Sequence, residues 1–127
     1  MKKAEDRKFD LEERVVEFGV TIAGIVESLT NSRTGVYLAN QLIQSGLSPA
    51  LNYGEAQAAE SRSDFIHKMK IVLKELRESS ISLKIITRLS LITPLEKLRS
   101  VSDEVNQLVA IFVKSIETAQ KNRNKRD

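Results

Sequence analysis

The chain has no cysteine, two prolines and a single histidine, His67, among its 127 residues. Without cysteine there is no disulfide framework and no thiolate metal site, and the composition suits a reducing compartment. His67 is not part of a Glu-x-x-His pair, so the sequence does not predict the di-iron centre of some helical bundles. It also shows no phosphate-binding glycine loop and no recognisable set of nucleophile, base and orienting residue. We therefore expect no cofactor, no metal and no enzymatic activity.

Long hydrophobic runs are also missing. The uncharged stretch over residues 18–26 is far too short to span a bilayer, and the N-terminal lysines precede no apolar segment of a secretory signal. We therefore expect a cytoplasmic protein that is not inserted in a membrane. With 41% hydrophobic and 29% charged residues, a chain of this length is expected to form one soluble domain with its own core.

Apolar residues recur at the spacing of amphipathic helices, and no alternating strand pattern is present. The pattern predicts four helices, over residues 10–29, 34–60, 63–91 and 94–120. Four long helices with short connections predict an all-α, up-and-down four-helix bundle that comprises the whole chain. For the second helix, the residues expected to face the core first are Val36, Ala39, Leu42 and Ile43.

Several residues mark where these helices begin or bend. Asp10 forms a capping box with Glu13 at the start of the first helix. The fourth helix is expected to start at Thr93-Pro94, an N-cap residue followed by proline in the first helical position. Within the second helix, Gly46 and Pro49 predict a kink or short break near residues 46–49.

Charge is distributed unevenly, although the net charge is only +3. Residues 10–29 contain five acidic residues and one basic residue, whereas residues 64–91 contain six basic and three acidic residues. Five of these basic residues share one narrow stripe of the third helix: Lys70, Lys74, Arg77, Lys84 and Arg88. Such a stripe is a track for a nucleic-acid backbone, a contact for an acidic partner or a solvated face. Because no aromatic residues accompany it, sequence-specific reading of single strands is not expected.

Three isoleucines lie away from the inner stripe of the third helix: Ile71, Ile81 and Ile85. A monomeric bundle has little reason to place isoleucines on an outer face. They therefore predict a subunit interface of a homo-oligomer.

Polar residues gather around the connection between the second and third helices: Asn52, Tyr53, Glu55, Ser61 and Asp64. Ser61 or Ser63 is suited to cap the third helix, and Asp64 favours its first turn by meeting the helix dipole. Polar groups buried at such a corner must pair with each other or with helix ends. We expect these residues to have a structural role.

The same corner resembles the four-helix-bundle proteins encoded in rRNA intervening sequences of bacteria. The matching segments are residues 52–56 (NYGEA), 61–68 (SRSDFIHK) and 73–78 (LKELRE), with further similarity at 38–42 (LANQL) and 111–116 (IFVKSI). The resemblance implies a bundle that assembles into a pentameric ring. It also implies kinship with the accessory protein of diversity-generating retroelements, which uses a basic surface to engage nucleic acid and a reverse transcriptase.

Together these features lead to two hypotheses of different classes. The first is a non-enzymatic, homo-oligomeric bundle that binds RNA or DNA through backbone electrostatics, without sequence preference. The alternative is a protein-interaction scaffold whose basic stripe meets an acidic protein partner or its own acidic first helix. Salt separates them, because phosphate binding weakens steeply with salt in proportion to the contacts made.

Overall fold

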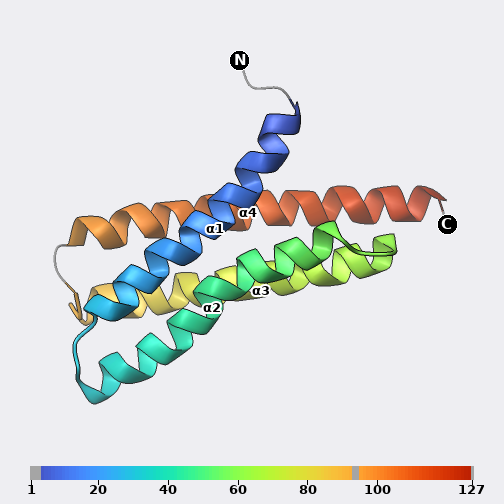
Figure 1. Ribbon diagram of the computed structural model, residues 1–127. Coiled ribbons are helices and arrows are strands. Elements are labelled where there is room, and N and C mark those ends of the chain that lie inside the picture. The colour runs from blue at the N-terminus through green and yellow to red at the C-terminus, as the bar shows by residue number, and fades with distance from the viewer. Residues whose placement is uncertain (1–3, 93–94, 127) are drawn as a thin grey trace.

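The computed structural model describes the backbone of residues 4–92 and 95–126 and the side chains of residues 11–92 and 95–124. Within these residues the protein is all-helical, with four helices: α1 (Ala4–Ser28), α2 (Arg33–Gln57), α3 (Arg62–Arg88) and α4 (Leu95–Arg126). Consecutive helices pack on each other, and α1 contacts α4 more sparsely. The N-terminal turns of α1 extend away from the other three helices (Figure 1). The expected four-helix bundle is confirmed.

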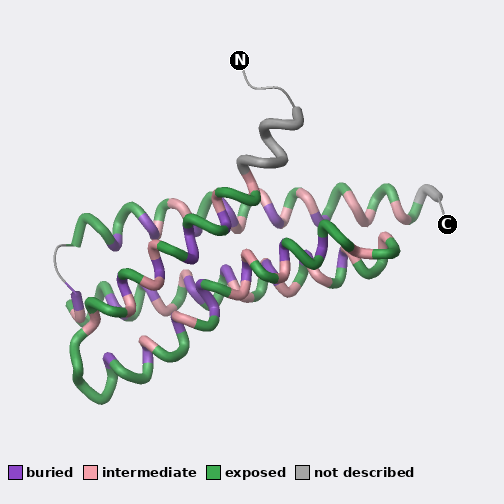
Figure 2. The backbone as a smooth tube through the Cα atoms, in the orientation of Figure 1, coloured by how far each residue is buried: buried purple, intermediate pink, exposed green. Residues whose placement is uncertain are grey.

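The core lies where the four helices face each other (Figure 2). For α1, α3 and α4 it contains the residues that helical periodicity selects, among them Phe18, Val72, Leu76, Leu108 and Phe112. Within the described residues, no helix is both long and apolar enough to cross a membrane.

The first helix begins earlier than its sequence predicts. Its backbone is helical from Ala4, so Asp10 lies inside α1 and is not its N-cap. The segment from Ala4 to Asp10 contains no glycine or proline, the residues that most disfavour a helix interior. The segment therefore allows the helix to extend past the expected start.

Pro49 lies inside α2, which is helical without interruption from Arg33 to Gln57. Of the kink or short break expected near residues 46–49, the break is therefore absent. A proline in a helix interior costs about 3 kcal/mol, and burial on both sides of it, at Leu42 and Tyr53, offsets that cost. Gly46 has another role, because a Cβ atom there would lie only 2.4 Å from the Ile22 side chain, so glycine permits close contact between α1 and α2.

The inner face of α2 is rotated relative to the sequence-based expectation. Leu42 is buried as expected, but Val36 is 45% exposed, and Leu38 occupies the buried position instead. Ala39 and Ile43 are half-buried. The expectation rested on one short stretch at the start of the helix, where two helical phases are compatible with the apolar residues.

The third helix ends at Arg88, before the expected position 91. Ser90 follows with a φ of 53°, and the Leu91 N–H donates to the Ile86 carbonyl oxygen at 3.2 Å. This is a Schellman motif, which terminates the helix without help from the residues that follow. Thr93 and Pro94, to which the start of the fourth helix is assigned from sequence, lie outside the described residues.

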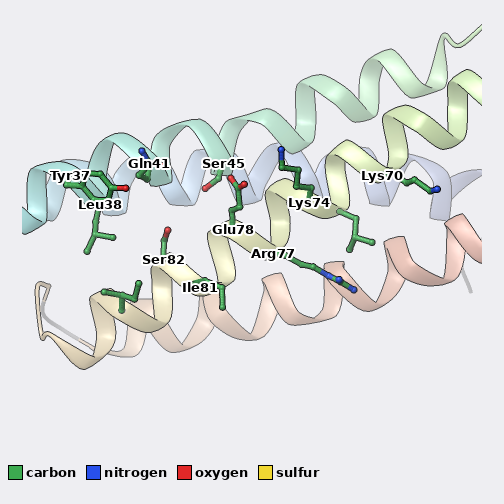
Figure 3. A pocket seen from close by; sticks show the side chains of 12 residues that line it. Tyr37, Leu38, Gln41, Ser45, Lys70, Lys74, Arg77, Glu78, Ile81 and Ser82 are labelled. Carbon is green, nitrogen blue, oxygen red and sulfur yellow. The ribbon is translucent and has the colours of Figure 1, made fainter.

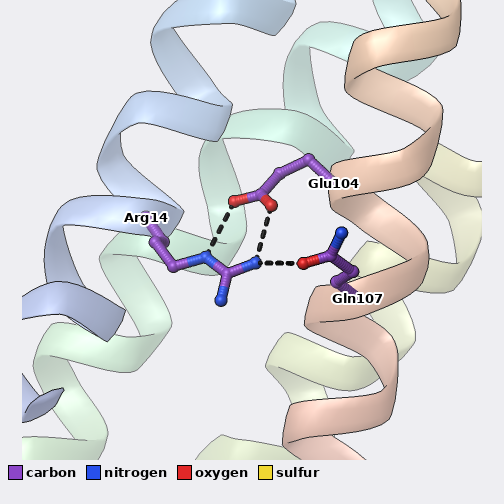
Figure 4. Close-up of polar contacts among 3 residues, drawn as sticks. All are labelled: Arg14, Glu104 and Gln107. Atoms are coloured by element: carbon purple, nitrogen blue, oxygen red, sulfur yellow. Dashed lines mark hydrogen bonds and ion pairs between the residues drawn. The ribbon is translucent and has the colours of Figure 1, made fainter.

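Two polar links cross the seams between helices. In the core, the Ser79 hydroxyl of α3 donates to the Ser45 hydroxyl of α2 at 2.8 Å, and both side chains are buried. At the surface, the guanidinium of Arg14 in α1 donates to both carboxylate oxygens of Glu104 in α4, at 3.0 and 2.6 Å, and to Gln107 at 3.1 Å (Figure 4). The second link holds α1 to α4, the seam with the sparser contacts.

Candidate nucleic-acid interface

The outer face of α3 carries the basic residues singled out from the sequence: Lys70, Lys74, Arg77, Lys84 and Arg88. All five are exposed, and within the described part of the chain none of them forms an ion pair. We call these five residues the basic face. Its charges are not neutralised by carboxylates in contact and are available to an external anion.

Three members of the basic face line a groove on the α2–α3 seam: Lys70, Lys74 and Arg77 (Figure 3). The groove has a volume of about 660 Å³. The other residues that line it are Tyr37, Leu38, Gln41, Ser45, Leu73, Glu78, Ile81, Ser82 and Ile85. It is therefore a mixed surface, with aliphatic and aromatic side chains beside cations, and we call it the α2–α3 groove.

Lys84 and Arg88 lie outside this groove. They line a smaller hollow between α3 and α4, of about 300 Å³, together with Arg99 and Asp103. The structure thus places three residues of the basic face around the α2–α3 groove and the other two around the hollow between α3 and α4. A ligand that follows all five must run along α3 rather than sit in either hollow.

The isoleucines predicted to form a subunit interface share the groove with these cations. Ile81 and Ile85 line it and are 55% and 41% exposed, whereas Ile71 is half-buried and lies outside its lining. Two surfaces that the sequence treats as separate therefore coincide. A partner that covers Ile81 and Ile85 also meets Lys74 and Arg77.

Acidic groups temper the charge of this region. Glu78 lines the groove and Glu75 lies beside it on α3. Burial raises the pKa of the Glu75 carboxyl, the neighbouring charge of Glu78 raises it further, and Lys74 acts in the opposite direction. Glu78 therefore offsets part of the positive charge of the α2–α3 groove.

The residues predicted to form a structural corner take several different roles. Asn52 donates to the Ser48 hydroxyl at 2.8 Å, and both residues lie within α2. The ring of Tyr53 is buried and meets Phe112 of α4 edge to face, with centroids 5.7 Å apart. Asn52 and Tyr53 therefore stabilise the fold through separate local contacts, not through one shared polar network.

The remaining corner residues lie at the α2–α3 turn. The Glu55 carboxylate binds the Lys68 ammonium of α3 at 2.6 Å. Ser61 is the N-cap of α3, and its hydroxyl accepts a hydrogen bond from the Asp64 N–H at 3.0 Å. Asp64 is exposed in the first turn of the helix. These contacts fix the direction in which α3 leaves the turn.

Sequence reasoning missed the contribution of α2 to the groove. Tyr37 is 62% exposed and Gln41 is also exposed, and both line the groove opposite α3. The sequence offers one indication of these positions, because Tyr37 is an aromatic residue directly before Leu38, which is buried. The observed inner face of α2 differs from the expected one, so the pattern does not place Tyr37 beside α3. His67 is exposed, and among the described residues no cluster of three histidine or carboxylate side chains is able to hold a metal ion.

Comparison with known proteins identifies the relatives of this chain. Residues 7–114 match the 23S rRNA-intervening sequence protein family. The chain belongs to this family. A solved structure, a protein of unknown function from the S23 ribosomal protein family of Bacteroides thetaiotaomicron, is 30% identical and superposes with a TM-score of 0.76. That match covers 84% of this chain and 97% of the other. No curated protein gives a significant match.

Membership in the 23S rRNA-intervening sequence protein family bears out the resemblance to proteins encoded in rRNA intervening sequences. The matched segment includes the basic face and the α2–α3 groove, and it ends inside α4. The similar Bacteroides protein has no assigned activity. The function of this chain must therefore be argued from its own surface.

Proposed function

We propose that the protein is a non-enzymatic, homo-oligomeric helical bundle that binds RNA or DNA along the basic face of α3, without reading sequence. The observation that carries this proposal is the line of five exposed cations, none of which forms an ion pair with a described residue. From Lys70 to Arg88 the line extends about 27 Å, at ~1.5 Å per residue. Contacts to phosphates position a protein on nucleic acid but carry no sequence information.

Oligomerisation belongs to the same proposal. Tyr37, Ile81 and Ile85 are exposed apolar side chains on the α2–α3 groove and support a contact to a second copy along the apolar side of this groove, with the charged ends of Lys70, Lys74 and Arg77 left open at its edge. Lys84 and Arg88 lie outside the groove and remain accessible when it is covered. An assembly repeats the basic face once per subunit, so weak phosphate contacts gain avidity. The number of subunits that the family resemblance implies is five.

A second function is favoured by one observation, the mixed chemistry of the groove. Apolar side chains flanked by Lys70, Lys74 and Arg77 suit an amphipathic helix with acidic residues on its flanks. In this reading the protein is an interaction scaffold, and the cations steer an acidic partner into the groove. Lys84 and Arg88 then have no part in binding, which distinguishes this function from the first.

Nucleic-acid binding is tested by fluorescence anisotropy with a labelled oligonucleotide at several salt concentrations. Two charge-reversal variants are compared, Lys84→Glu/Arg88→Glu outside the groove and Lys70→Glu/Lys74→Glu/Arg77→Glu inside it. Both should weaken binding, and each lost phosphate contact should reduce the slope of log affinity against log salt by about 0.7–0.9. The matched control is Lys97→Glu/Lys121→Glu, exposed lysines of α4. Equal binding by the parent protein and Lys84→Glu/Arg88→Glu favours the scaffold, and no binding by the parent at low salt refutes the proposal.

The assembly is tested by light scattering of the parent protein and of Ile81→Glu and Ile85→Glu. We expect an oligomer for the parent and dissociation in the variants, because a buried charge at an apolar contact is strongly unfavourable. Leu51→Glu is the control, since Leu51 is an exposed apolar residue of α2 outside the groove. A parent species of 14.3 kDa would refute the oligomer, and dissociation by Leu51→Glu alone would place the interface elsewhere.

A further inference from the structure

A second hollow is lined by residues from the α2–α3 turn, the start of α3 and the C-terminal half of α4. Its volume is about 690 Å³, and it shares no residue with the α2–α3 groove. Two cations and four neutral polar side chains line it: Arg62, Lys114, Ser61, Ser115, Thr118 and Asn122. We call it the end hollow.

Arg62 is the unusual member of the end hollow. Its Nη1 atom is buried and has no hydrogen-bond partner among the described residues. That atom is closed to solvent, so the Arg62 guanidinium meets a ligand in the end hollow through its other N–H groups. Arg62 is also the first residue of α3, so the positive end of the helix dipole adds to its charge. The position therefore favours an anion.

Other donors converge on the same space. The Ser61 hydroxyl oxygen accepts from the Asp64 N–H, which leaves its own proton free to donate. Across the hollow, Lys114 and Thr118 stand one turn apart on α4, and Ser115 lies beside them. Within the described residues neither Arg62 nor Lys114 forms an ion pair. The hollow thus offers guanidinium, ammonium and hydroxyl donors from two helices.

One acidic residue opposes this preference. Glu60 lines the end hollow and is exposed. Its charge lowers the affinity for an anion but does not cancel the two cations. It also gives the site a residue whose neutralisation must strengthen binding if the ligand is negatively charged.

We propose that the end hollow binds a phosphate group in the form of a phosphate monoester. The charge of about −1.5 to −2 and the three acceptor oxygens of such a group match two cations and the hydroxyl donors. The monoester belongs either to a small molecule such as a mononucleotide or to the phosphorylated end of a nucleic-acid strand. The site does not depend on the basic face of α3.

The test follows the protein by NMR while inorganic phosphate or adenosine monophosphate is added, with chloride used to keep ionic strength constant. Saturable shifts are expected at the amides of residues 61–64 and at the Arg62 Nε–H. Arg62→Gln and Lys114→Gln should each weaken binding about tenfold, the effect of losing one charge-assisted hydrogen bond. Arg62→Lys should weaken it less, and Glu60→Gln should strengthen it. Lys97→Gln, an exposed lysine at the other end of α4, should leave it unchanged.

Two further arms separate the sources of the phosphate. An oligonucleotide with a 5′-phosphate is compared with the same strand ending in a 5′-hydroxyl. Preference for the phosphorylated strand, lost in Lys114→Gln, assigns the site to strand ends, and no preference combined with binding of adenosine monophosphate assigns it to small molecules. Shifts no larger than those with chloride, or undiminished binding by folded Arg62→Gln and Lys114→Gln, overturn the proposal. The Lys70→Glu/Lys74→Glu/Arg77→Glu variant should bind inorganic phosphate like the parent, so this site and the basic face can fail independently.

Discussion

The α2–α3 seam and the α1–α4 seam are each crossed by a polar link, but the two links lie at different depths. In the first, the Ser45 and Ser79 hydroxyls meet at 2.8 Å with both side chains buried. In the second, Arg14 binds Glu104 through two hydrogen bonds, and 34% and 31% of the two side chains remain exposed. The charged link has more bonds, whereas the uncharged one has less water around it.

Depth decides which link matters more for stability. A buried hydroxyl that loses its partner cannot be satisfied by water, so removing one side of the pair is unfavourable. An exposed ion pair is replaced by solvation, and measured contributions of such pairs are small. The weaker bond in the core should therefore have the larger effect when one partner is removed.

Ser45→Ala should have the largest effect of the substitutions that test this comparison. It leaves the Ser79 hydroxyl buried without its acceptor, and we expect the free energy of unfolding to fall by about 1–3 kcal/mol. Ser79→Ala should cost less, because Ser45 keeps a 3.4 Å hydrogen bond to the Leu42 carbonyl oxygen. Urea denaturation at one fixed protein concentration measures both.

The double variant Ser45→Ala/Ser79→Ala is the control for this prediction. With both hydroxyls gone no polar group is left unpaired, so the double variant should lose less stability than the two single variants added together. If the losses in unfolding free energy of the two single variants simply add up in the double variant, the two hydroxyls act independently and the buried hydrogen bond does not couple them.

These serines also show what the sequence is able to predict about the fold. Helical periodicity places the apolar residues Val72, Leu76 and Leu83 on the inner stripe of α3, and all three are buried. Ser79 lies between them on the same stripe and is buried, but a hydroxyl carries no apolar signal. Its partner Ser45 is on another helix, so the pair follows from tertiary packing and not from local pattern.

The basic face could be predicted from the sequence, whereas the α2–α3 groove and the end hollow could not. The five cations of the basic face lie on one helix, so helical periodicity alone places them on one side. The groove needs Tyr37 from α2, and the end hollow needs Arg62 beside Lys114 of α4. Which residues of separate helices meet depends on how the helices cross, and the sequence pattern of a single helix does not give that geometry.

Glu104→Gln tests the exposed link between α1 and α4, and it should lower the free energy of unfolding less than Ser45→Ala does. It removes the charge that holds Arg14 and leaves the packing of α1 on α4 in place. We expect a loss of about 0.5–1 kcal/mol at low salt, since the pair is partly exposed, and a smaller loss at high salt because ions screen it. Glu117→Gln, an exposed residue of α4 without an ion pair to a described residue, should leave unfolding unchanged. A loss that is larger than that of Ser45→Ala, or independent of salt, would contradict the ranking by depth.

Lys68→Gln should change the free energy of unfolding least of these substitutions. It compares an exposed polar link with a buried one on the same α2–α3 seam. The Lys68 ammonium donates to the Glu55 carboxylate at 2.6 Å on the outside of the seam that Ser45 and Ser79 cross in the core. This hydrogen bond and the charge of Glu55 raise the pKa of Lys68 above its ordinary value of 10.5. Because the folded-state pKa is raised, the stabilisation is fully present below the unfolded-state pKa and is lost as the pH rises through the folded-state pKa.

The difference in unfolding free energy between the parent protein and Lys68→Gln should therefore be small at neutral pH and vanish in the alkaline range. Burial, with a further contribution from the charge of Glu12, also raises the pKa of Tyr53, so both proteins should lose stability in that range. Only the difference between them reports the ion pair, and urea denaturation over a pH series measures it. Lys97→Gln serves as the matched control, because Lys97 is an exposed lysine without an ion pair to a described residue. If the difference persists at alkaline pH, Lys68 stabilises the seam through its aliphatic stem, and charge at the surface of this seam is irrelevant to the comparison.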